Sequence, residues 1–138
     1  MTTPEELERE HTLLTAVARF NVLRGRATMA ATAEEMADGE PSVVPPLTSA
    51  EALELLALGE AIVRKAGYGR QLDVRAARRA GASWTRIGAA LGTTKQSAWE
   101  LHQRWIDVQA ARGERVDHTG LSPQDAAEAR RLAGLPEE

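Results

Sequence analysis

The sequence predicts an all-α protein. Its 138 residues are rich in alanine, leucine, arginine and glutamate, which are strong helix formers. β-branched residues are few and scattered, and no stretch alternates apolar and polar residues with the period of two expected of a strand. Signals that start helices recur instead, at Thr3-Pro4-Glu5-Glu6, Thr48-Ser49-Ala50-Glu51 and Ser122-Pro123-Gln124-Asp125.

The N-terminal part predicts a helical arm. A helix is expected from Pro4 to about Arg24, weakening at Gly25, with a second helix continuing to Ala37. Residues 1–37 therefore form the expected arm, whose apolar stripe suits oligomerisation. Residues 38–47 read DGEPSVVPPL, and their glycine and prolines exclude a helix. This segment is the predicted linker and the expected domain boundary.

Two further helices follow the linker. Thr48 opens a helix expected to end around residues 67–69, and residues 70–80 form the next helix, which ends at Gly81. In this second helix a polar face is expected opposite an apolar face. The polar face holds Gln71, Arg75, Arg78 and Arg79, and the apolar face holds Val74, Ala77 and Ala80.

Residues 81–100, GASWTRIGAALGTTKQSAWE, predict one helix that stops and another that starts almost at once. Ser83 is expected to cap a helix that begins at Trp84 and ends at Gly92, where a left-handed backbone suits glycine. Thr94 then caps a helix that runs from Lys95 to about residue 111. Helices joined by so short a turn must cross steeply, so a small residue is needed where they touch. The expected contact residues are small Gly88 and a shared core of Ile87, Leu91, Ala98 and Leu101.

These positions give the stretch a resemblance to the helix-turn-helix superfamily of DNA-binding domains. The match is closest to the short tri-helical domains of actinobacterial regulators and of the promoter-reading end of sigma factors, and covers about residues 71–106. Thr93 departs from the pattern, because an apolar residue is usual there. The resemblance implies a helix-turn-helix domain with its supporting helix at 48–112. Additional N-terminal helices precede it, and a loop and short C-terminal helix at 113–138 follow it.

The resemblance also implies which residues meet DNA. The second helix of the motif, about residues 94–106, is expected in the major groove with its first residues near base edges. Lys95 can reach guanine or a phosphate, and Gln96 can pair with adenine, although Gln96 can also be a solvated helix residue. The exposed positions are Thr93, Thr94, Lys95, Gln96, Trp99, Glu100 and Gln103. Backbone contacts are expected from Arg86, Arg75, Arg78, Arg79 and Arg104.

Three aromatic residues and one carboxylate in this region have structural interpretations as well. Trp99 either packs on the DNA or covers the edge of the domain, and partial burial is favoured. Trp84 and Trp105 are expected in the core, given their spacing to the apolar residues of the two helices. Glu100 either accepts a hydrogen bond from a cytosine amine or, as favoured here, pairs with Arg104 one turn further along the helix.

The charge distribution favours a polyanionic partner. The net charge is −3, but residues 64–115 hold eleven basic and four acidic side chains, which leaves six basic and sixteen acidic side chains elsewhere. A basic region carried by an acidic remainder is typical of nucleic-acid binding, although basic side chains also simply solvate helical surfaces.

Other classes of protein are not supported by the sequence. There is no cysteine, and His11, His102 and His118 lie on separate elements without metal-ligand spacing. There is no phosphate loop or nucleophile elbow either, so neither catalysis nor a cofactor or metal is expected. The acidic N-terminus does not resemble a signal peptide, and the longest apolar stretch is interrupted by Glu54 and Glu60. A cytoplasmic, nucleoid-associated location without a membrane is therefore expected.

Two hypotheses of function follow. The first is a DNA-binding transcriptional regulator, or a chromosome-associated protein, that acts on double-stranded DNA. A homodimer joined through the long N-terminal helices is favoured, and the alternative is that these helices complete the core of a monomer. The second is a protein-interaction adaptor or antitoxin-like module whose basic face meets an acidic protein. The acidic N-terminal helices could also dock a protein partner.

Overall fold

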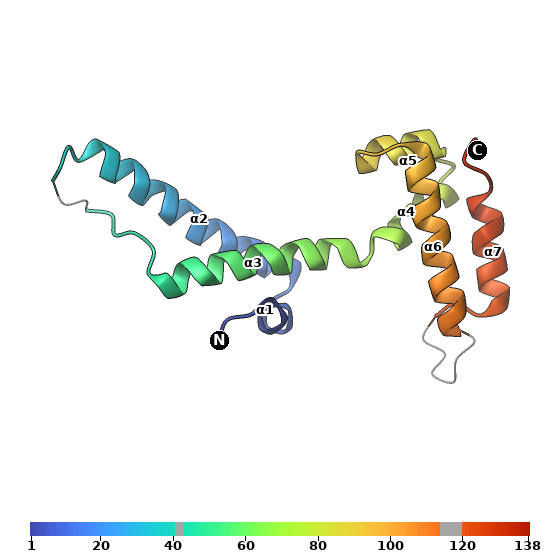
Figure 1. The fold of residues 1–138 in the computed structure, drawn as a ribbon, viewed down its shortest axis with the longest axis horizontal. Helices are drawn as coiled ribbons and strands as arrows, with labels where there is room; N and C mark the ends of the chain where they lie inside the picture. Colours follow the sequence, from blue (N-terminus) through green and yellow to red (C-terminus); the bar gives the residue numbers. More distant parts are fainter. Residues whose placement is uncertain (41–42, 114–119) are drawn as a thin grey trace. The chain divides into compact units, whose positions relative to one another are not determined.

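The computed structural model describes residues 1–40, 43–113 and 120–138, and the regular structure within these ranges is helical throughout (Figure 1). The predicted all-α class is therefore confirmed. The chain divides into two compact units, Met1–Tyr68 and Gly69–Glu138, here called unit 1 and unit 2. No helix in the described ranges is long and apolar enough to cross a membrane.

Unit 1 contains α1 (Pro4–Glu10), α2 (Leu13–Met36) and α3 (Ser49–Tyr68). The prediction of one helix from residue 4 to 24 is wrong, because the chain breaks at His11 and Thr12. Thr12 and Thr15 form a reciprocal capping box there, which starts α2 afresh. The predicted weakening at Gly25 is also wrong, because α2 continues through this glycine to Met36.

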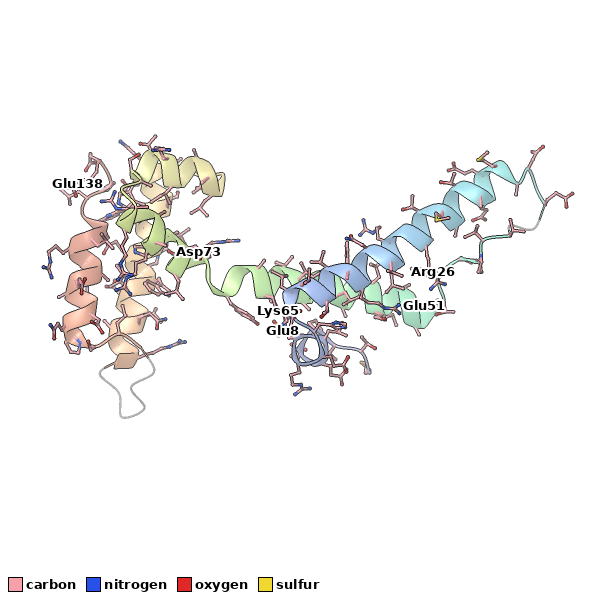
Figure 2. The ribbon with its side chains drawn as sticks, turned by 180° about the vertical axis from the view of Figure 1, so that it is seen from behind. Glu8, Arg26, Glu51, Lys65, Asp73 and Glu138 are labelled. Atoms are coloured by element: carbon pink, nitrogen blue, oxygen red, sulfur yellow. The ribbon has the colours of Figure 1, made fainter. Side chains whose placement is uncertain are left out.

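The core of unit 1 forms where α1 and α2 both pack against α3. It is made of small and aliphatic side chains: Leu7, Ala16, Leu23, Ala57, Leu58 and Ala61. Two ion pairs join α2 to α3. The Nη2 atom of Arg19 lies 2.8 Å from the Oε1 atom of Glu54. Arg26 pairs with Glu51 further along the same two helices (Figure 2). The hydrogen bond from Arg26, helped by the backbone N–H of Thr48, lowers the pKa of Glu51 to about 2.

The boundary between the units differs from the predicted one. The helix that begins after Thr48 was expected to support the DNA-binding domain, but its buried face contacts α1 and α2 instead. The linker 38–47 therefore lies within unit 1, although residues 41 and 42 fall outside the described ranges. Thr48 caps α3 through the predicted capping box with Glu51.

Unit 2 contains α4 (Arg70–Arg79), α5 (Trp84–Leu91), α6 (Lys95–Gly113) and α7 (Pro123–Ala133). Ser122 caps α7 as predicted, and α6 and α7 lie side by side (Figure 1). The expected loop before α7 falls largely on residues 114–119, which lie outside the described ranges. All four helices contribute to one core, made of Val74, Trp84, Ile87, Ala98, Ile106, Ala129 and Ala133. The C-terminal helix thus belongs to the same unit as the predicted motif, rather than forming a separate appendage.

Candidate nucleic-acid interface

The turn between α5 and α6 has the predicted local structure. The hydroxyl of Ser83 accepts the backbone N–H of Arg86 at the start of α5. Gly92 ends α5 in the left-handed conformation, with φ +72° and ψ +28°. The hydroxyl of Thr94 then accepts the backbone N–H of Ser97 at 3.0 Å, which caps α6. Three residues therefore separate the two helices.

Gly88 lets the turn approach α5 closely. A Cβ atom at this position would lie 2.9 Å from the backbone N of Lys95, the backbone O of Thr93 and the carbonyl C of Thr94. These neighbours are backbone atoms, so no side chain can rotate out of the way. The carbonyl of Gly88 also accepts the N–H of Thr93 at 2.8 Å. The predicted need for a small residue at this contact is confirmed.

The predicted core between α5 and α6 is correct for two of four residues. Ile87 and Ala98 are 4% and 1% exposed, whereas Leu91 and Leu101 are 38% and 46% exposed. The buried face of α6 is set by Ala98, His102 and Ile106, which are spaced four residues apart. Leu101 precedes His102 by one residue and is therefore turned by about 100° around the helix axis.

The residues at the start of α6 are open to solvent. Thr93, Thr94, Lys95 and Gln96 are all exposed, and Gln103 further along the helix is half-buried. The side-chain amide of Gln96 donates to Glu100 at 2.9 Å, so the structure pairs Glu100 with Gln96 and not with the predicted Arg104.

The indoles of Trp84 and Trp99 connect this region to the end of α7. Trp84 is completely buried, and its Nε1 donates to the carbonyl of Ala133 at 2.7 Å. Trp99 is half-buried, as favoured from the sequence, and its Nε1 donates to the carbonyl of Gly134 at 2.8 Å. Carbonyls at a helix C-terminus have no intrahelical donor, so these indoles satisfy groups that would otherwise need water. Nothing in the local sequence around α7 indicates this connection.

The predicted polar face of α4 is partly turned inward, which corrects the expected role of Arg78. Its guanidinium donates to the carbonyls of Leu132 at 3.2 Å and Ala82 at 2.9 Å, and lies 5.3 Å from the ring centroid of Trp84. Arg75 is half-buried, and its Nε atom has no hydrogen-bond partner among the described residues. Arg79 alone of the three arginines is exposed.

His102 lies between two tryptophans inside unit 2. The residue is 1% exposed. Its ring stacks on that of the half-buried Trp105, with 5.4 Å between the ring centroids, and its centroid lies 5.6 Å from that of Trp84. Its Nδ1 donates to the side-chain oxygen of Gln71 at 2.9 Å. Burial lowers the pKa of His102 to about 4, and the positive charges of Arg75 and Arg78 contribute to this shift to a smaller extent. This histidine is therefore uncharged near neutral pH and is part of the packing of unit 2.

This histidine predicts an acid-sensitive unit 2. The unfolded chain binds a proton at His102 near pH 6.5, whereas the folded chain does so near 4, so the unfolded state is favoured as the pH falls between these values. We expect the free energy of unfolding, followed by tryptophan fluorescence in urea, to decrease from pH 6.5 to pH 4. In His102→Phe, which cannot titrate, this part of the decrease should disappear. An unchanged slope in the folded variant would contradict the assignment.

The stretch of chain that contains the turn carries basic residues and no acidic one, although the carboxylate of Glu100 follows directly and contacts Gln96. Between Asp73 and Glu100 the sequence contains no acidic residue, and its basic residues are Arg75, Arg78, Arg79, Arg86 and Lys95. Arg86 on α5, Arg79 on α4 and Lys95 on α6 are exposed, as is Arg104 further along α6. The N-terminus of α6 adds the partial positive charge of its unpaired N–H groups. The arrangement can therefore attract an anionic surface.

Comparison of the chain with protein-family models, curated proteins and solved structures found no match. Within the described residues no group of three or more histidine, aspartate or glutamate side chains is arranged to hold a metal ion.

Proposed function

We propose that unit 2 binds double-stranded DNA in the manner of a helix-turn-helix domain and acts in transcriptional regulation. The observation that supports it best is the exposed segment from Thr93 to Gln96 at the start of α6, held against α5 by the close contact at Gly88. This segment lies in a part of the chain with five basic side chains and no acidic one. A helix whose N-terminal residues are exposed can enter the major groove of B-DNA and place those residues at the base edges.

The exposed side chains take distinct roles in this proposal. Lys95 and Gln96 face the base edges, and the amide of Gln96 exchanges its bond to Glu100 for one to a base. Thr93 and Thr94 lie at the phosphates nearest the helix start. Phosphate contacts further out come from Arg79, Arg86 and Arg104, whose side chains are exposed. Arg78 is engaged inside unit 2 and acts on the fold instead.

The two base-facing residues provide the test. In Lys95→Ala with Gln96→Ala, we expect the affinity for a preferred duplex to fall by at least about 30-fold, because each of the two base contacts contributes about 1–3 kcal/mol. Fluorescence anisotropy with the full-length chain measures the change. Both side chains are exposed, so helix content should be unchanged.

A matched control lies at the other end of the same helix. Gln109→Ala with Arg112→Ala removes the same kinds of side chain from α6 and should leave the affinity within about threefold of the wild type. If the control weakens binding as much as Lys95→Ala with Gln96→Ala does, the start of α6 does not read the DNA.

An acidic protein partner is the second candidate. The exposed cations Arg79, Arg86, Lys95 and Arg104 could pair with the carboxylates of such a partner as well as with phosphates. An adaptor of this kind would show no retained binding to duplex DNA at physiological salt, whereas the DNA-binding hypothesis predicts binding that weakens as salt rises.

A further inference from the structure

Helix α2 carries apolar residues on two opposite faces. The inner face, with Ala16, Leu23 and Ala30, is buried in unit 1. The other face is open to solvent, with exposed fractions of 53% for Val22, 61% for Met29 and 80% for Met36. A helix that is apolar on both sides is normally covered on both sides. We call the exposed set the outer stripe; it consists of Ala18, Val22, Gly25, Met29, Thr32 and Met36, all of them exposed.

The spacing of the outer stripe is that of a coiled-coil seam. Its residues follow one another at alternating intervals of four and three, which places them along one line on the helix surface. Thr32 is the one polar side chain on this line, and it is short and carries a methyl group. Gly25 lies near the middle, where a Cβ would meet nothing in unit 1, so the packing of this unit does not require a glycine there. Glycine inside a helix is destabilising, but because it has no side chain it allows a second helix to approach closely.

The sizes of the side chains allow two copies of the outer stripe to pack well when they run antiparallel but not when they run parallel. Its smallest residues, Ala18 and Gly25, lie in the first half, and its two methionines lie in the second half. When two copies of α2 run antiparallel about a two-fold axis near residue 27, the small half of each copy faces the large half of the other. The facing pairs are Ala18 with Met36, Gly25 with Met29, and the similarly sized Val22 and Thr32. In a parallel pair the small residues would face one another and leave gaps, while the methionines would collide.

The charges beside the outer stripe permit the antiparallel pair. On one flank, Arg19 and Arg26 are already paired with Glu54 and Glu51 of α3, so that flank is neutral. On the other flank lie Asn21, Thr28 and Glu35. In the antiparallel arrangement Asn21 of one copy lies opposite Glu35 of the other, and the two Thr28 side chains lie near each other. No like charges therefore face each other on this flank.

We propose that the outer stripe binds a second copy of this chain through an antiparallel α2–α2 contact. Contact along about five helical turns reaches the lower end of the roughly 1,200–2,000 Å² buried by specific interfaces, so the dimer should dissociate on dilution. This interface does not depend on DNA binding and stands if that proposal fails.

Sedimentation equilibrium of the full-length chain over micromolar to millimolar concentrations tests the interface. Met29→Glu should weaken dimerisation at least tenfold, because it places two carboxylates in the seam. Leu56→Glu is the matched control, and it should leave dimerisation unchanged. Leu56 is 71% exposed on α3 and lines two grooves of unit 1, of about 600 and 540 Å³, which are the other apolar surface through which two copies could meet. A wild type that stays monomeric, or a dimer lost in Leu56→Glu but kept in Met29→Glu, would overturn the proposal.

The absence of cysteine from the chain makes the orientation testable. Val22→Cys chains mixed with Thr32→Cys chains should form a mixed disulfide under mild oxidation, whereas each variant alone should form little. Disulfides in Val22→Cys alone would indicate a parallel pair and overturn the antiparallel assignment. Both positions are exposed, and circular dichroism checks that the variants remain helical.

Discussion

Trp84→Ala is expected to lower the free energy of unfolding of unit 2 by about 3–5 kcal/mol, because the substitution leaves a large cavity in a closed core. The indole is completely buried between α5, α6 and α7 and lies under the guanidinium of Arg78. Its N–H is the donor to Ala133, so the carbonyl at the end of α7 also loses its partner. Urea unfolding followed by the fluorescence of Trp99 and Trp105 measures the loss.

Trp84→Phe separates the two contributions. It keeps most of the ring volume but removes the donor, so the loss should be smaller, about 1–3 kcal/mol. Tyr68→Ala in unit 1 is the control; Tyr68 is 71% exposed, and all three tryptophans lie in unit 2, so this variant should leave the fluorescence transition unchanged. A Trp84→Ala protein as stable as the wild type would show that α7 is not held in this way.

Gly88→Ala is expected to destabilise unit 2 by about 1–3 kcal/mol, even though alanine is the better helix former. The added methyl group would lie 2.9 Å from three backbone atoms of residues 93–95, so the turn has to move away from α5. The same movement shifts the start of α6, and the affinity for duplex DNA should fall with the stability. Urea unfolding and anisotropy on the same variant measure both effects.

The matched control is the same substitution at Gly67. This glycine lies near the end of α3, and a Cβ there would meet nothing within 4 Å. Gly67→Ala should therefore raise the stability of unit 1 by about 0.5–1 kcal/mol. If Gly88→Ala also stabilises the protein, α5 and the turn do not pack as closely as described.

Helix starts and tight turns were predictable because a few neighbouring residues decide them. The caps at Ser83, Thr94 and Ser122 are hydrogen bonds across three residues, and each forms as expected. The left-handed backbone at Gly92 is equally local. These features define the start of α6, which is the part of the candidate site that the sequence described correctly.

Contacts between distant segments were not predictable in the same way. The break at Thr12 depends on a capping box whose second member is a threonine rather than the usual glutamate or glutamine. Arg78 was placed on the polar face of its helix because of the helical periodicity, yet its guanidinium turns toward the end of α7, which lies 54 residues away in the sequence. Leu101 shows the same limit, since a periodic pattern does not say which edge of the apolar stripe a partner helix covers.

Titration of a fluorescent random-sequence duplex with the full-length chain at several salt concentrations tests the central claim most directly. With Arg79, Arg86, Lys95 and Arg104 exposed, one chain is expected to neutralise up to four phosphates, which gives a slope of about −3 to −4 in log affinity against log salt. Recovery of the bound pool should then enrich a preferred site. The absence of duplex binding even at the lowest salt would contradict the proposal and direct attention to an acidic protein partner.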